Sequence, residues 1–238
     1  MTDQIESIPI DRLNYPAGLR AIHDPPQTLY VRGNKDLLNR PGVAIVGTRH
    51  CSKAGAIIAR RMAQFLVEQG YVIISGLALG IDAAAHEGGL ERTIAVLAHG
   101  LHEANPKANA VLAQRILDAG GAWVSEHPAG KPPNRNLFVP RNRIQVGLSV
   151  GSIIVESDIK SGTMTHANFA MEENHPLFVV LPQESTNPLG LQCAGPQRLV
   201  DQKGAMAIRT KHDYAMMLEK LREQRDVLTR SELNVRSG

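Results

Sequence analysis

The chain has 238 residues, of which 43% are hydrophobic and 21% charged, and its formal net charge is +3. This composition is typical of one large globular domain, or of one domain with a small appendage, and it excludes disordered and fibrous classes. The longest uncharged apolar stretch, residues 144–155, is too short and too polar to predict a transmembrane helix. The N-terminus does not read as a secretory signal, and Cys51 and Cys193 form no disulfide framework, so we expect a cytoplasmic protein without a membrane association.

The first forty residues are rich in turn-forming residues, among them Tyr15-Pro16 and Asp24-Pro25-Pro26. They predict an N-terminal extension packed on a core domain of residues 41–210. From residue 211 to the end, the mixed charges and helical pattern predict a charged helical tail.

Within the core, short β-branched runs alternate with amphipathic helical patterns at the spacing of βαβ units. The predicted strands cover residues 43–46, 71–74, 93–97, 122–124, 152–155 and 177–181, with a further strand at 205–208. The predicted helices cover residues 54–69, 81–90, 107–119, 140–150 and 163–174. This order predicts an α/β fold with an open, doubly wound, mostly parallel sheet and helices on both faces.

Two long windows of the sequence carry basic residues and no acidic ones. Residues 37–67 hold Arg40, Arg49, Lys53, Arg60 and Arg61, and residues 127–155 hold Lys131, Arg135, Arg141 and Arg143. If both windows face one groove, they create a positive field suited to phosphates. The alternative is that these side chains are solvated surface charges.

In a doubly wound sheet, ligands bind beyond the carboxyl ends of the strands, so the loops there are the candidate sites. Gly47-Thr48-Arg49 follows the first core strand and leads into a helix, which predicts an anion site unless it is an ordinary tight turn. Ser75-Gly76 and Gly80-Ile81-Asp82 follow the second strand, and their glycines allow a close approach of the backbone to a ligand. Asp82 and His86, four residues apart on a helix, are candidates for proton transfer, although Asp82 at a helix N-terminus needs no such role.

Two further loops carry candidate binding residues. Phe138 precedes Arg141-Asn142-Arg143, and an aromatic ring beside guanidinium groups is typical of single-stranded nucleic-acid binding. The alternative is a packed Phe138 with solvated arginines. Lys160-Ser161-Gly162-Thr163 predicts a second oxyanion site, or else simple capping of the helix that follows.

Two other motifs are excluded by their context. Residues 147–151 spell the hydrolase nucleophile elbow, but that motif needs a strand before it and a helix after it, and the predicted order here is the reverse. His86, His99 and His102 lack the spacing of a zinc site, so we expect no metal.

Taken together, these motifs resemble one family, the DNA-processing protein A family, also called DprA or Smf. The resemblance covers residues 15–208. It is carried in chain order by Tyr15-Pro16, Leu29-Tyr30-Val31-Arg32-Gly33, Val46-Gly47-Thr48-Arg49, Ser75-Gly76-Leu77-Ala78, Gly80-Ile81-Asp82, Ala85-His86, Ala95-Val96-Leu97, Gly100-Leu101, Ser125-Glu126, Pro128, Gly130, Arg141-Asn142-Arg143-Ile144, Gly147-Leu148-Ser149, Val155-Glu156 and Ser161-Gly162.

The resemblance implies an extended Rossmann-like domain that binds single-stranded DNA without sequence preference, forms a homodimer and helps to load a RecA-type recombinase. It implies no catalysis and no cofactor. In this reading Arg49 holds a phosphate, Phe138 stacks on a base, Arg141 and Arg143 extend the basic rim, and backbone donors line the pocket. The DNA-binding residues that it implies are Gly47, Thr48, Arg49, Ser75, Gly76, Gly80, Phe138, Arg141, Asn142, Arg143, Lys160, Ser161 and Gly162.

The chain departs from the family pattern at several positions. Val139 stands where the family has proline, His166 where it has threonine, and Gln183 where glycine follows Pro182; residues 187–196 also depart from it. We expect a core domain without the family's N-terminal helical domain or C-terminal winged helix.

Two alternatives stay open. The first is a protein that binds a nucleotide-like small molecule, as a sensor or as an enzyme, because the wider superfamily includes nucleotide phosphoribohydrolases. For such an enzyme Glu156, Asp82 and His86 would supply the acid and base, although the Pro-Gly-Gly-x-Gly-Thr-x-x-Glu motif of those hydrolases is absent from this sequence. The altered segment after Pro182 also fits an interaction protein that keeps the fold and has lost DNA binding.

Overall fold

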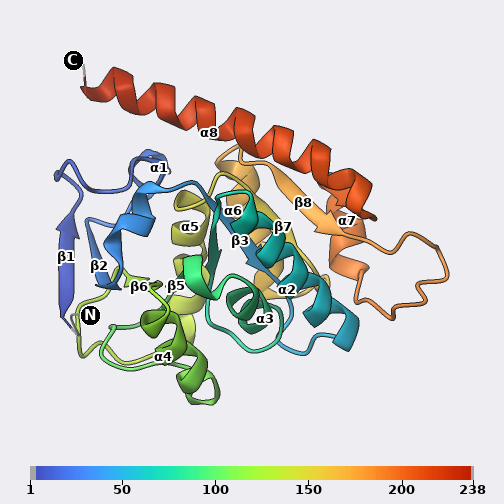
Figure 1. The fold of residues 1–238 in the computed structure, drawn as a ribbon, viewed down its shortest axis with the longest axis horizontal. Coiled ribbons are helices and arrows are strands. Elements are labelled where there is room, and N and C mark those ends of the chain that lie inside the picture. Colours follow the sequence, from blue (N-terminus) through green and yellow to red (C-terminus); the bar gives the residue numbers. More distant parts are fainter. Residues whose placement is uncertain (1–3, 237–238) are drawn as a thin grey trace.

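The computed structural model describes residues 4–236, with side chains up to residue 230. Within these residues one nine-stranded sheet runs through the molecule in the order β1-β2-β6-β5-β4-β3-β7-β8-β9 (Figure 1). The strands are β1 (Ile5–Pro9), β2 (Thr28–Gly33), β3 (Gly42–Val46), β4 (Val72–Ser75), β5 (Thr93–Val96), β6 (Ala122–Ser125), β7 (Ser152–Ile154), β8 (Leu177–Val180) and β9 (Met206–Ile208). Strands β3 to β9 pair in parallel, whereas β1 with β2 and β2 with β6 pair antiparallel.

Helices cover both faces of the sheet, because the side chains of the parallel strands are buried on both sides. In β3, for example, Val43 and Ile45 join the cluster packed on α2 and α3, whereas Ala44 and Val46 face the opposite layer. One layer is α2 (Lys53–Glu68), α3 (Ile81–Gly88) and α4 (Ala110–Asp118); the other is α1 (Ala17–Ala21), α5 (Phe138–Gly147), α6 (Gly162–Glu172) and α7 (Ala194–Lys203). The doubly wound α/β fold predicted from the sequence is thereby confirmed.

A long C-terminal helix, α8 (Tyr214–Arg236), lies across the molecule on the side where β3 begins (Figure 1). Met217, Leu218 and Leu221 enter the same hydrophobic cluster as α2 and α3. Further along the helix, Leu228 lies beside Gly18 of α1. The helix therefore contacts both helical layers.

The predicted core strands and helices all occur, with boundaries that differ by at most three residues. The structure adds α1, α7 and the two N-terminal strands, which the sequence patterns did not indicate. These strands extend the sheet edge at β6, so the N-terminal segment supplies strands as well as covering α5 through Leu19 and Ile22. The domain boundaries themselves stay a prediction.

The rejected nucleophile motif lies between α5 and β7, so a helix precedes it and a strand follows it. Its serine, Ser149, is buried and donates a hydrogen bond to the Gln145 carbonyl oxygen at 2.8 Å. Across residues 4–236, we find no helix with both the length and the apolar character needed to cross a bilayer.

Candidate functional site

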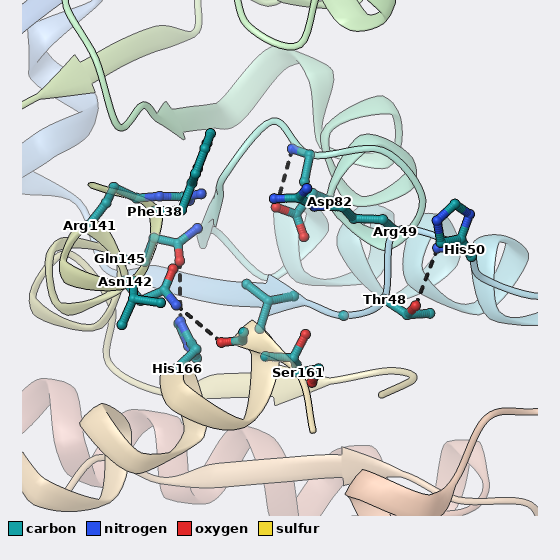
Figure 2. Close-up of a pocket in the computed structure, with 16 residues that line it drawn as sticks. Thr48, Arg49, His50, Asp82, Phe138, Arg141, Asn142, Gln145, Ser161 and His166 are labelled. Atoms are coloured by element: carbon teal, nitrogen blue, oxygen red, sulfur yellow. Dashed lines mark hydrogen bonds between the residues drawn. The ribbon is translucent and has the colours of Figure 1, made fainter. Parts of the chain in front are cut away.

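The candidate site lies where the strand order reverses, at the carboxyl ends of β3 and β7. From β3 the chain continues to β4 on one side, whereas β7 pairs on the other side. This is the position at which doubly wound sheets bind ligands. A cavity of about 310 Å³ opens there between the loop after β3, the start of α3, and helices α5 and α6 (Figure 2).

The loop after β3 lies close to the start of α3 because Gly80, which precedes α3, has no side chain. Gly80 has a φ of +77°, and a Cβ at this position would overlap the carbonyl groups of Thr48 and Arg49. The Ile81 amide donates to the Thr48 carbonyl oxygen at 3.2 Å. Gly80 therefore positions the loop that carries Arg49 and does not itself line the cavity.

Arg49 and Phe138 meet at the exposed rim of the cavity. Arg49 comes from the loop after β3 and Phe138 from the first turn of α5, yet the guanidinium carbon lies 5.5 Å from the centre of the phenyl ring. Both residues line the cavity (Figure 2). A cation and an aromatic ring at one opening provide the two groups that a nucleotide requires, one for its phosphate and one for its base.

The buried floor of the cavity carries opposite charges. The side chains of Arg141 and Asp82 line it although they are only 6% and 5% exposed. Burial lowers the pKa of Arg141 to about 10, so the guanidinium remains charged at neutral pH. Burial raises the pKa of Asp82, and the charge of Arg141 opposes that shift. Gly76 packs directly on the guanidinium of Arg141, because a Cβ there would overlap it.

Polar side chains of α5 and α6 complete the floor. Asn142 donates from Nδ2 to the Gly162 carbonyl oxygen at 3.2 Å and so joins α5 to the start of α6. Gln145 and His166 lie next to it (Figure 2). Neither was a predicted binding residue, although Gln145 stands one helical turn after Arg141 and His166 is a departure from the family pattern.

Most of the predicted binding residues lie at this cavity. The lining includes Gly47, Thr48, Arg49, Phe138, Arg141, Asn142, Ser161 and Gly162, and also Thr163 of the predicted oxyanion loop. His50, Ala78 and Val139 line it as well and were not predicted as binding residues. Ser75 and Gly76 lie behind it, and the Ser75 hydroxyl donates to the Ile45 carbonyl oxygen at 2.7 Å. Lys160 is exposed in the loop before α6 and does not line the cavity.

Arg143 also lies outside the cavity. Its guanidinium donates to both carboxylate oxygens of Glu126, at 2.9 and 2.7 Å, and it lies 2.9 Å from a carboxylate oxygen of Asp24. The Arg143 side chain is 10% exposed. This pairing ties α5 to the loop after β6 and to the N-terminal segment.

The acid and base candidates for a hydrolase do not converge on the cavity. Glu156 accepts hydrogen bonds from the Ser52 amide and hydroxyl, both at 2.8 Å, and from the Gln192 amide at 3.0 Å. His86 bonds through Nδ1 to the Thr93 hydroxyl at 2.7 Å, and burial lowers its pKa to about 3. Of the three candidates, Asp82 alone lines the cavity.

Comparison with known proteins identifies the family. The model of the family described as DNA recombination-mediator protein A matches residues 6–219. The DNA processing protein DprA of Bacillus subtilis is 36% identical over 213 residues, which are 88% of this chain and 70% of that protein. The protein Smf of Escherichia coli is 39% identical over 204 residues, which are 84% of this chain and 53% of that protein.

Two solved structures have the same fold. DNA processing protein A of Helicobacter pylori, solved in a study of its single-stranded DNA binding mode, superposes with a TM-score of 0.79 at 32% identity. That comparison covers 91% of this chain and 96% of the other. DprA of Streptococcus pneumoniae superposes with a TM-score of 0.80 at 37% identity, over 90% of this chain and 74% of the other. The chain therefore belongs to the DNA recombination-mediator protein A family, the DprA/Smf proteins.

Proposed function

We propose that this chain binds single-stranded DNA at the cavity without sequence preference, forms a homodimer and helps to load a RecA-type recombinase onto the bound strand. The observation that carries the DNA-binding part is the pairing of Arg49 with Phe138 at the rim of the cavity. The recombinase and the homodimer are proposed from family membership.

The rim provides separate contacts for the two parts of a nucleotide. A phosphate binds the exposed guanidinium of Arg49. A base stacks on Phe138, and such stacking is open to single strands whose bases are unpaired. Arg141 lies below the rim as a second guanidinium that lines the cavity, with Asp82 as its opposite charge.

The floor supports binding without sequence preference. Asn142 is bonded to Gly162, and the polar groups of Gln145 and His166 face neighbouring polar groups of the protein. Reading a base requires donors or acceptors that are open to its edge. Stacking and phosphate contacts do not distinguish one base from another.

Fluorescence anisotropy with a labelled oligonucleotide tests the DNA-binding part. We expect single strands to bind more tightly than a duplex of equal length, with an affinity that falls as salt increases. Arg49→Ala should reduce the slope of log affinity against log salt by about 0.7, the value for one single-strand phosphate contact. Phe138→Ala should lower the affinity by about tenfold or more and leave the slope unchanged, because stacking is worth about 1–3 kcal/mol per base.

The matched control is Arg115→Ala, which removes an exposed arginine of α4 away from the cavity. If Arg49→Ala and Phe138→Ala bind DNA as Arg115→Ala does, the cavity is not the DNA site. If the folded wild-type protein binds no DNA at low salt, the interaction-protein alternative replaces the proposal.

A separate assay tests the mediator role. Adding the protein to a RecA-type recombinase and single-stranded DNA should accelerate strand exchange, and the Arg49→Ala protein should accelerate it less. Sedimentation velocity at increasing protein concentration should show a dimer. A monomer at all concentrations would remove the homodimer from the proposal.

A further inference from the structure

The buried side of the cavity contains a polar chain that links β7, α6 and α5. It runs from Ser152 through His166 and Gln145 to Arg141, and the side chains of all four residues are at least nine-tenths buried. Buried polar groups of this kind hold a fixed arrangement when each donor meets an acceptor. The hydrogen bonds therefore define the positions of the side chains.

The hydrogen bonds assign one orientation to Gln145. With its amide nitrogen toward His166 Nδ1 and Asn142 Oδ1, at 3.2 and 3.1 Å, its oxygen accepts from the Gly76 amide at 2.9 Å and from Arg141 Nη1 at 2.7 Å. In this orientation the Gln145 amide is rotated by 180° relative to Figure 2. Its nitrogen then faces two acceptors and its oxygen faces two donors.

That orientation of Gln145 fixes the tautomer of the His166 imidazole. Nδ1 accepts from Gln145, so the proton is on Nε2, which donates to the Ser152 hydroxyl at 2.9 Å. Burial lowers the pKa of His166 to about 3, with the charge of Arg141 acting in the same direction. A neutral imidazole with this tautomer is the form that the two neighbours require.

The position of Arg141 depends on this polar chain of side chains. Its Nε is buried and has no hydrogen-bond partner among the described residues, whereas its Nη1 donates to the Gln145 oxygen. Without His166, the Gln145 amide nitrogen keeps only Asn142 Oδ1 as an acceptor, so the orientation that points the Gln145 oxygen at Arg141 is held less strongly. In the rotated amide, the Gln145 nitrogen and Arg141 Nη1 would be two donors facing each other.

We propose that His166 is a positioning residue for DNA binding: it orients the Gln145 amide, which in turn holds the Arg141 guanidinium at the floor of the cavity. The inference rests on the proposed function, since it assigns a determinant of single-strand affinity at the same site. Threonine, the residue that the family pattern has here, is too short to make both bonds.

A double-mutant cycle tests whether His166 acts through Arg141. His166→Leu keeps the volume and removes both bonds, and it should lower single-strand affinity by about tenfold, as for the loss of one charge-assisted hydrogen bond. Arg141→Met should lower it at least as much. The double variant should bind single-stranded DNA as tightly as Arg141→Met does, because His166 affects the affinity only through Arg141.

Two further variants make the result specific. His166→Gln retains an acceptor for Gln145 and a donor for Ser152, so it should restore most of the affinity. His166→Leu combined with Arg49→Ala should show additive losses, because Arg49 lies outside the polar chain. All affinities are compared below the unfolding transition of each variant, measured by circular dichroism.

The outcomes separate the two proposals. Wild-type affinity in His166→Leu, or additive losses with Arg141→Met, overturns the positioning role while Arg49→Ala still reports the DNA site. A wild-type protein that binds no single-stranded DNA overturns the function and this inference with it.

Discussion

At the scale of single residues, the structure divides the basic side chains by their partners. Arg49 is exposed at the rim of the cavity, Arg141 is buried beneath it, and Arg143 is paired with two carboxylates elsewhere. The hydrogen bonds that Arg143 donates to Glu126 raise the pKa of Arg143. A DNA contact from Arg143 would require these ion pairs to open, so that role stays a prediction.

Replacing Arg143 should therefore change stability. Arg143→Ala leaves the Glu126 carboxylate, 20% exposed, without its bidentate partner. We expect the free energy of unfolding to fall by about 3 kcal/mol, the lower end for a broken buried ion pair. Urea denaturation measures this loss. Arg115 is exposed, so Arg115→Ala should change the free energy of unfolding by less than about 0.5 kcal/mol. If Arg143→Ala has an equally small effect, the ion pair between Arg143 and Glu126 contributes nothing to stability.

At the scale of elements, one carboxylate joins three segments around the site. Glu156 follows β7, and it holds Ser52, whose hydroxyl caps α2 by accepting from the Gly55 amide at 2.9 Å. The same carboxylate accepts a hydrogen bond from the backbone amide of Gln192, just before α7. The loop with Arg49 lies between β3 and this capped helix, so Glu156 supports the rim without facing the cavity.

The long helix α8 offers an element-scale test. Leu221 is fully buried in the cluster beneath α2, whereas Val227 on the same helix is 54% exposed. Leu221→Ala should lower the free energy of unfolding by about 3 kcal/mol, since it leaves a cavity in a packed core. Val227→Ala should lower it by less than about 0.5 kcal/mol. Equal effects in urea denaturation would show that α8 is not docked as described.

At the scale of the whole molecule, buried histidines link stability to pH. Burial lowers the pKa of His86 and His166 to about 3 and that of His175 to about 4. In the unfolded chain each binds a proton near pH 6.5, so below that pH the unfolded state takes up protons that the folded state does not. Stability is therefore greatest above about pH 6.5 and falls progressively toward the folded pKa values.

The expected loss is about 2 kcal/mol for each of these histidines between pH 7 and pH 5. Asp82 acts in the opposite direction, because its pKa is raised in the folded state. Urea denaturation at several pH values measures the net fall. His175→Leu removes one of these groups, whose buried Nδ1 has no hydrogen-bond partner within the described part of the chain, so this variant should show a weaker pH dependence. A midpoint that is constant from pH 7 to pH 5 would contradict the argument.

Local sequence patterns predicted the core strands, five helices of the core and the helical tail that forms α8, because alternation and helical periodicity depend on neighbouring residues. The patterns did not indicate α7, since Gly195-Pro196 in its first turn is typical of a loop. They also did not indicate β1 and β2. Strand β2 pairs with the edge of β6, which lies about a hundred residues later in the chain, and β1 pairs in turn with β2.

The sequence by itself determined the doubly wound fold, the family, and the loops beyond the strands where the site forms. The tertiary structure decided which residues of those loops meet. Arg49 lies against Phe138, and Arg141 bonds to Gln145, which bonds in turn to His166. Arg143 instead donates hydrogen bonds to Glu126. The reason is that the sequence gives the charge and shape of each residue directly, whereas the residue that it contacts lies in a distant segment of the chain. Only folding brings the two together, and the nearest complementary group then fixes the role of each side chain.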